Sequence, residues 1–261
     1  MRRAALALAA VMLALPVAGV SAWATSGLSA FAFRPHPGAR LPLSAVLVDE
    51  EGRAVALGDF FVGKPVVLVL EYLRCKSLCG LTLENVVAAL DALPLAAGRD
   101  FEMLAISIDP RDTPADIARA KEKYLAGYRH QGGGRGIHFL AGTAASVRRI
   151  ADTIGFLYQY DADTGQYVHP AGFIIAAPDG RISRYVFGIG ENSAELRAGL
   201  VAAAHGEAAG PLTRLFLLCH IEGAPLGRYT VPVMGALMIG NISAGAALIL
   251  IFAGIRRRRH G

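Results

Sequence analysis

The run from Pro65 to Tyr72, PVVLVLEY, leaves few folds open to this chain. A continuous apolar run of this length is typical of a strand that is buried on both faces of a sheet. A second run of the same kind, FEMLAISI, extends from Phe101 to Ile108. The residues from Leu81 to Leu93 between them have a helical period, which predicts two strands joined through a helix.

The same alternation of strands and helices continues along the chain. We therefore expect an α/β fold in which a mixed sheet is flanked by helices and has an antiparallel strand at one edge, as in the thioredoxin-like arrangement. In open sheets of this kind, functional sites form beyond the carboxyl ends of the strands. The further expected elements are a hairpin over 43–48 and 54–57, a helix from an N-cap at Thr113 to about Tyr128, a strand over 137–140, a helix over 143–154, a hairpin over 173–177 and 181–187, and a helix over 194–205.

The two ends of the chain have the composition of targeting segments. Residues 1–24 combine a basic start, an apolar run and the sequence Ala22-Trp23-Ala24, which predicts a secretory signal peptide; an uncleaved N-terminal anchor is the alternative. Residues 231–255 carry no charge and are long enough to form a transmembrane helix. The four arginines at 256–259 mark the cytoplasmic side, so residues 256–261 are predicted to be a cytoplasmic basic tail.

These segments define the rest of the organisation. Residues 25–40 contain prolines and glycines and are predicted to be a linker. Residues 41–210 form the expected folded domain, and residues 211–230 form a juxtamembrane segment before the span. The orientation of the span predicts a single-pass protein of a bacterial inner membrane, with its domain in the periplasm.

The net charge of +5 belongs to the ends of the chain rather than to the domain. Six of the 26 basic residues lie in the signal peptide and the tail, so residues 25–255 carry 20 basic against 21 acidic residues, a net charge of −1. A near-neutral domain lacks the basic surface that binds polyanions, which argues against nucleic acid as a partner.

Two of the three cysteines, Cys75 and Cys79, follow the first buried strand at the point where a helix is expected to begin. Thiols four residues apart lie on one face of a helical segment. A helix N-terminus and the neighbouring Arg74 and Lys76 favour the thiolate form. Such a pair can bind a soft metal such as Cu(I), cycle through a disulfide, or form a static disulfide, and the spacing leaves all three open.

Among the seven histidines, His169 is the candidate for a third ligand. It directly precedes the strand of the last hairpin, and in a thioredoxin-like fold that loop lies beside the cysteine loop. Redox proteins of that fold often carry a cis-proline here, so a cis bond is expected at His169–Pro170. Cys219 and His220 are better explained as part of a membrane-surface helix with a buried free thiol. The other histidines are expected to be solvated or packed residues: His36, His130, His138, His205 and His260.

Two further motifs have simpler explanations. Asp109, Arg111 and Asp112 could form an acid/base group, but a turn followed by a helix start explains them as well and is favoured. The glycines at 132–134 lack the preceding strand and the lysine of a phosphate-binding loop.

Taken together, these motifs resemble the Sco/SenC family of copper-binding cytochrome c oxidase assembly proteins, and the resemblance covers residues 41–205. It is carried by the strand with the Cys75/Cys79 loop, by SIDPRDTP over 107–114, by FLAG over 139–142, and by His169 nine residues before Pro178-Asp179-Gly180. The resemblance implies a thioredoxin-like fold that binds one copper ion through Cys75, Cys79 and His169.

The resemblance also implies a function and partners. The protein would deliver copper to the dinuclear copper centre of a cytochrome c oxidase, or reduce the cysteines of that centre, during assembly. Its partner would be the copper-centre subunit of the terminal oxidase, with another periplasmic copper chaperone or a thiol reductase as further partners.

Three departures from the family pattern are present, two of them at this site. Gly80 stands where the family usually has proline, and Val168 stands where it usually has aspartate before the histidine. Because a carboxylate beside a ligand imidazole orients the ring and raises its basicity, copper affinity depends on what replaces that acid. Asp161 and Asp163 are the candidates that lie nearby in the sequence. The predicted anchor is C-terminal, whereas many members have an N-terminal one.

Two other functions remain open at this point. One is a membrane-tethered thiol–disulfide oxidoreductase or peroxidase that uses Cys75 and Cys79 without a metal. The other is a structural thioredoxin-like interaction domain with an inert disulfide. His169 separates copper binding from simple dithiol exchange, because only copper binding needs an imidazole ligand.

Overall fold

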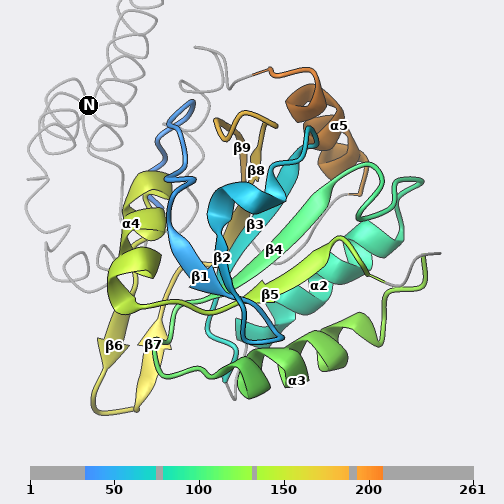
Figure 1. Cartoon of the computed structure of the whole chain (residues 1–261). Coiled ribbons are helices and arrows are strands. Elements are labelled where there is room, and N and C mark those ends of the chain that lie inside the picture. Colours follow the sequence, from blue (N-terminus) through green and yellow to red (C-terminus); the bar gives the residue numbers. More distant parts are fainter. Residues whose placement is uncertain (1–32, 75–78, 131–133, 188–192, 208–261) are drawn as a thin grey trace, which may run out of the picture.

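The computed structural model describes residues 33–74, 79–130, 134–187 and 193–207 (Figure 1). The predicted signal peptide, juxtamembrane segment, transmembrane span and basic tail lie outside these residues, as do Cys75 and Cys219. No helix within the described ranges is long and apolar enough to cross a membrane.

A five-stranded sheet forms the centre of the domain, with the strand order β5-β4-β3-β8-β9. β3, β4 and β5 run parallel to one another, β8 is antiparallel to β3, and β9 is antiparallel to β8. The expected mixed sheet is therefore confirmed, and it is consistent with the thioredoxin-like arrangement. The antiparallel strand was expected at the edge, but it is β8, which lies inside the sheet, whereas the edge strand β9 runs in the same direction as β3. The strands are β3 (Val66–Glu71), β4 (Glu102–Ser107), β5 (Ile137–Leu140), β8 (Gly172–Ala176) and β9 (Ile182–Phe187).

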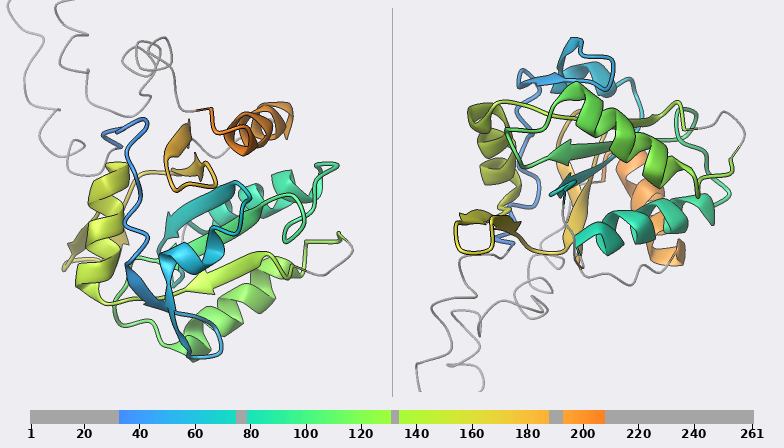
Figure 2. Two further views of the ribbon diagram at one scale, coloured as in Figure 1. Left: turned by 45° about the horizontal axis from the view of Figure 1, so that its top comes forward. Right: turned by 90° about the horizontal axis from the view of Figure 1, so that it is seen from below.

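Helices cover both faces of this sheet (Figures 1 and 2). Three of them pack on one face, namely α2 (Cys79–Asp91), α3 (Pro114–Leu125) and α5 (Ser193–Ala204). The other face is covered by α4 (Ala144–Ile154) and by the short hairpin of β1 (Val46–Val48) and β2 (Ala54–Ala56). The helices expected over 81–93, 113–128, 143–154 and 194–205 are present as α2, α3, α4 and α5. Thr113 caps α3 as predicted, because its side chain accepts a hydrogen bond from the backbone N–H of Asp116.

The central strand β3 has apolar side chains on both faces of the sheet. All six of its residues are buried. Val66, Leu68 and Leu70 belong to the core on one face, and Val67 and Val69 belong to the core on the other. This alternation follows from the two-residue period of a strand, so each face of β3 must be covered by apolar side chains.

Three features differ from the expectations or add to them. A second small hairpin of β6 (Gln159–Asp161) and β7 (Gln166–Val168), visible at the lower left of Figure 1, has no counterpart in the predicted elements. Phe33, within the predicted linker, is buried and packs edge-to-face on Phe156. The prediction of a cis bond at His169–Pro170 is wrong, since no peptide bond in the described ranges is cis.

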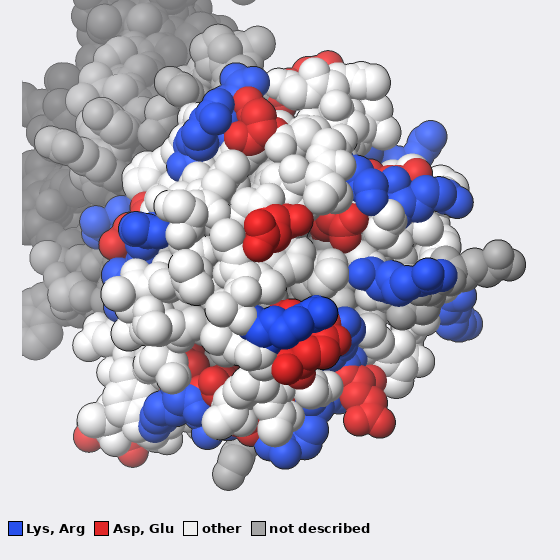
Figure 3. All heavy atoms as spheres, in the orientation of Figure 1, with Lys and Arg blue, Asp and Glu red and all other residues white. Residues whose placement is uncertain are grey.

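On the face shown in Figure 3, acidic and basic side chains lie next to one another, in keeping with a near-neutral domain.

Candidate functional site

The fold brings the loop before β8 to the end of β3. In the antiparallel pair, Val66 lies opposite Ala176 and Leu68 opposite Ile174, so the end of β3 at Glu71 approaches the residues that precede β8. His169 is one of these residues. The cysteine loop leaves β3 at the same end, and Cys79 is the first residue of α2. The strand pairing therefore places His169 at the base of the cysteine loop, while Cys75 itself lies outside the described residues.

His169 is held against a buried glutamate. Its Nε2 atom lies 3.2 Å from Oε1 of Glu71, and the two side chains are only 3% and 1% exposed. Its Nδ1 atom lies 3.1 Å from the carbonyl oxygen of Pro170. The ring also stacks on Phe156, with 5.8 Å between the ring centroids and 27° between the planes. The imidazole is thus fixed from several sides in a water-excluded position.

Glu71 is an exception in an otherwise apolar strand. Burial raises the pKa of its carboxyl group, and the hydrogen bond and charge of His169 offset part of that increase. Oε1 accepts a hydrogen bond of 3.0 Å from the backbone N–H of Tyr72. Oε2 is buried and has no hydrogen-bond partner within the described part of the chain. A buried oxygen without a partner is costly, so Glu71 calls for a reason other than the packing of the sheet.

Asp161 and Asp163, which the sequence suggested as the carboxylate beside His169, do not contact that histidine in the described structure; they belong to the turn between β6 and β7. The carboxylate of Asp161 accepts hydrogen bonds from the Thr164 hydroxyl at 2.8 Å and from the backbone N–H of Asp163 at 3.0 Å. It therefore closes the turn between β6 and β7. The carboxylate that contacts His169 comes from Glu71. Sequence reasoning missed it because Glu71 was counted within an apolar run, although a single acid at the end of that run was a signal.

A cluster of charges fixes the residue that precedes Cys75. Arg74 contacts two buried acids, with its Nη2 atom 3.0 Å from Oδ2 of Asp109 and its Nε atom 2.6 Å from Oδ1 of Asp112. Arg111 makes two further hydrogen bonds to Asp109, of 2.8 Å each, and the Ser107 hydroxyl donates to Asp112. The sequence explained these residues as a turn and a helix start, which the capped start of α3 confirms. It did not reveal that they also hold Arg74, the residue before Cys75.

The two acids of this cluster have opposite pKa shifts. Burial raises the pKa of Asp109, but the hydrogen bonds from Arg111 and the charge of Arg74 outweigh it, so the pKa lies below its ordinary value. Burial also raises the pKa of Asp112, and there the hydrogen bond from Ser107 and the charge of Arg74 offset it only in part. Asp109 is therefore the ionised centre of the cluster.

The unexpected β6–β7 hairpin packs against the same region. The ring of Tyr167 contacts Tyr72, which follows β3, at a centroid distance of 5.5 Å, and it contacts Tyr160 at 5.2 Å. The guanidinium of Arg111 lies over the Tyr160 ring at 5.2 Å. The hairpin thereby connects the loop that carries His169 with the charge cluster beside the cysteine loop.

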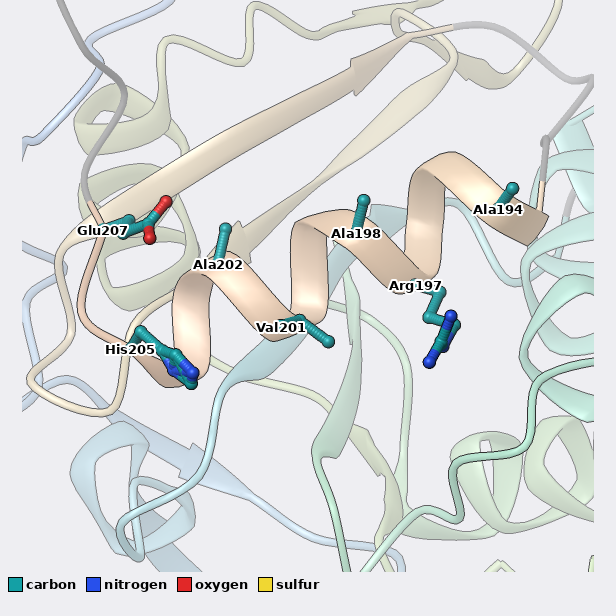
Figure 4. Close-up of a pocket in the computed structure, with 7 residues that line it drawn as sticks. All are labelled: Ala194, Arg197, Ala198, Val201, Ala202, His205 and Glu207. Atoms are coloured by element: carbon teal, nitrogen blue, oxygen red, sulfur yellow. The ribbon is translucent and has the colours of Figure 1, made fainter.

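The remaining histidines that the structure describes have separate contacts, in agreement with the sequence interpretation. His36 lies 3.2 Å from the carbonyl oxygen of Thr153, His130 lies 2.9 Å from that of Asp91, and His138 lies 3.4 Å from Glu102. His205 borders a pocket along α5 that contains none of the predicted ligands (Figure 4). That pocket is lined by Ala194, Arg197, Ala198, Val201, Ala202, His205 and Glu207.

No group of three potential metal ligands occurs within the described ranges. The predicted set needs Cys75, which lies outside them, so the ligand roles of Cys75, Cys79 and His169 stay predictions. Of this set, the structure describes the surroundings of His169, whose side chain is buried against the carboxylate of Glu71 at the end of β3.

Comparison with known proteins identifies the family. The SCO1/SenC family profile matches residues 42–204, which include Cys75, Cys79 and His169. The chain belongs to the SCO1/SenC family. No curated protein sequence matches this SCO1/SenC chain.

Solved structures share the fold of this SCO1/SenC domain. A protein of Aquifex aeolicus VF5 is 26% identical, with a TM-score of 0.58, and the match covers 66% of this chain and 96% of that one. Arabidopsis thaliana ScoI, solved with copper bound, is 19% identical, with a TM-score of 0.51 and coverage of 66% and 98%. BsSco, described as having a disulfide switch and as a member of the Sco family of cytochrome c oxidase assembly proteins, is 18% identical, with a TM-score of 0.52 and coverage of 66% and 97%.

Proposed function

We propose that this chain binds one copper ion through Cys75, Cys79 and His169. The observation that carries the proposal is the position of His169, which lies buried at the end of β3 where the cysteine loop begins. Two thiolates and an imidazole form a soft donor set that favours copper over hard cations such as magnesium or calcium. Family membership and the copper-bound structure of Arabidopsis ScoI support the same choice of metal.

The bound copper ion is cargo for a cytochrome c oxidase rather than a resident cofactor. The chain delivers copper to the dinuclear copper centre of the oxidase, or reduces the cysteines of that centre, during assembly. The partner is then the oxidase subunit that carries the centre, with a periplasmic copper chaperone or a thiol reductase as further partners. Support comes from the family and from the description of BsSco as a member of a family of oxidase assembly proteins.

The location proposed for this activity follows from the targeting segments. Residues 1–24 export the domain and residues 231–255 anchor it in a bacterial inner membrane, with the basic tail in the cytoplasm. The domain would then lie in the periplasm, on the same side of the membrane as an oxidase copper centre that faces outward.

A thiol–disulfide oxidoreductase is the second candidate. It is favoured by the spacing of Cys75 and Cys79, which lets the two thiols form a disulfide, and by the description of BsSco as having a disulfide switch. Such an enzyme would use Cys75 and Cys79 without a metal, and His169 would not be required for turnover.

Copper titration of the reduced full-length chain in detergent tests the first candidate. With Cu(I) and a competing chelator, we expect one tightly bound copper per chain, and a loss of affinity of more than about a hundredfold in Cys75→Ser, Cys79→Ser and His169→Ala. This loss should exceed the 10–100-fold effects of residues that only support a ligand.

The third cysteine provides the matched control. Cys219→Ser removes one thiol outside the proposed site and should bind copper as the unchanged chain does. If the unchanged chain holds copper no more tightly than Cys75→Ser, the delivery function is contradicted. Turnover of a disulfide substrate, lost in Cys75→Ser but kept in His169→Ala, would then support the oxidoreductase.

A further inference from the structure

We propose that Glu71 is a positioning residue for His169, whose imidazole it orients for the metal. This inference rests on the proposed copper site. In many metalloproteins, a ligand histidine donates its second ring N–H to a carboxylate, which fixes the ring and raises its basicity. The nitrogen that faces the carboxylate keeps its proton. The other nitrogen, Nδ1, would bond to the metal in exchange for its contact with the carbonyl oxygen of Pro170.

The first support is the geometry of the contact. Oε1 of Glu71 lies 3.2 Å from Nε2 of His169, and both side chains are almost completely excluded from solvent. Within a water-excluded site, the attraction between an imidazole and a carboxylate is stronger than at the surface, so this 3.2 Å contact can hold the ring in one orientation. Phe156, stacked on the face of the ring, prevents it from tilting away.

The second support is that the sheet gains nothing from an acid at this position. Every other residue of β3 is apolar, and an apolar side chain would fill the same space without the cost of burying a carboxyl group. Oε2 of Glu71 is buried without a hydrogen-bond partner within the described part of the chain. A buried acid that is only partly satisfied is expected at a functional site rather than in a structural core.

The third support is the local sequence. Val168 offers no carboxylate next to His169, and Asp161 is bound within the β6–β7 turn. Asp109 and Asp112 are paired with Arg74. Glu71 reaches His169 through the antiparallel pairing of β3 with β8, so an acid on a neighbouring strand does what an acid preceding the histidine would otherwise do.

The test compares Glu71→Gln and Glu71→Ala with a control acid. Glu102→Gln is the matched control, because Glu102 is also a buried strand glutamate in contact with a histidine, His138, at 3.4 Å. The chain is reduced in detergent and titrated with Cu(I) against a chelator, and the Cu(II) form is examined by its thiolate charge-transfer band and electron paramagnetic resonance spectrum. Thermal unfolding of each metal-free variant shows that it folds.

We expect Glu71→Ala to lower copper affinity by about 10–100-fold and to change both Cu(II) spectra. Glu71→Gln keeps the volume and one acceptor but not the charge, so it should bind with an affinity between those of Glu71→Ala and the unchanged chain. Glu102→Gln should leave affinity and spectra unchanged. Unaltered affinity and spectra in both Glu71 variants, with copper still bound by the unchanged chain, would overturn this inference alone. Absence of copper binding by the unchanged chain would overturn the proposed function and this inference with it.

Discussion

Replacing Gly155 by alanine should lower the free energy of unfolding by more than about 3 kcal/mol, because the new methyl group has no space. Gly155 ends α4 with a φ of 68°, and a Cβ atom there would lie 1.8 Å from the carbonyl oxygen of Arg34. That oxygen is part of the backbone, and the N–H of Arg34 donates a 2.7 Å hydrogen bond to the carbonyl oxygen of Gly155. The substitution must therefore push two backbone segments apart.

Gly63→Ala is the matched control for this prediction. Gly63 has a similar φ of 82°, but nothing lies within 4 Å of the position that its Cβ would occupy. Gly63→Ala should therefore lower the free energy of unfolding by only about 1 kcal/mol, which is the strain of an alanine in the left-handed conformation. Thermal and urea unfolding of the two variants measure the difference. Equal losses in both would mean that the close approach of Arg34 does not matter.

The expected effect of Gly155→Ala extends to the candidate site. The next residue, Phe156, stacks on His169 and also packs against Phe33. A shift of the backbone at Gly155 moves that ring, so the variant should also bind copper more weakly than Gly63→Ala does. Chelator competition at a temperature where both variants are folded measures this.

The sequence predicted the central sheet because its strands are long apolar runs or lie next to clear turns. β3 and β4 are buried at every position, so their composition differs sharply from that of the surrounding loops. The β6–β7 hairpin was missed for the opposite reason. Its strands have three residues each, none of them buried, and its sequence has no apolar period that distinguishes it from a loop.

The candidate site was predictable only where its signals are local. The spacing of Cys75 and Cys79 and the position of His169 before a strand can be read along the chain. The contact of His169 with Glu71 depends on the pairing of β3 with β8, which joins residues nearly a hundred positions apart. The run that contains Glu71 still reads as a buried strand. That Glu71 contacts His169 can be inferred only when the register of β3 against β8 is known.

Replacing Asp109 by asparagine should lower the free energy of unfolding by about 2–4 kcal/mol at pH 7. The Asp109 side chain is fully buried and accepts hydrogen bonds from Arg74 and Arg111. The neutral amide therefore removes the counter-charge of Arg111 and one of the two acids that contact Arg74. The guanidinium groups are partly exposed, which keeps the loss below that of a fully buried pair. Because Arg74 precedes Cys75, the variant should also weaken copper binding.

Asp179 provides a control with nearly the same local geometry. It accepts hydrogen bonds from the backbone N–H and the Nε of an arginine two residues later, Arg181, as Asp109 does from Arg111. Its side chain, however, is 40% exposed. Asp179→Asn should therefore cost less than about 1 kcal/mol, as for other surface ion pairs. A loss in Asp179→Asn as large as that in Asp109→Asn would contradict the role assigned to burial.

The pH dependence separates the charge of Asp109 from its packing. Burial raises the pKa of Asp109, but Arg111 and Arg74 bring it below the ordinary value, so the folded state holds its proton less tightly than the unfolded state does. The stability contributed by the ionised group is complete above the unfolded pKa, near 4, and is lost as the pH falls through the lower folded pKa. The difference between the unchanged chain and Asp109→Asn should therefore be constant from pH 7 to about 5 and should shrink below about pH 4. Chemical unfolding at pH 7, 5 and 3 measures it. A difference that stays constant to pH 3 would assign the loss to the shape of the side chain, because only an effect of the charge disappears when the carboxylate is protonated.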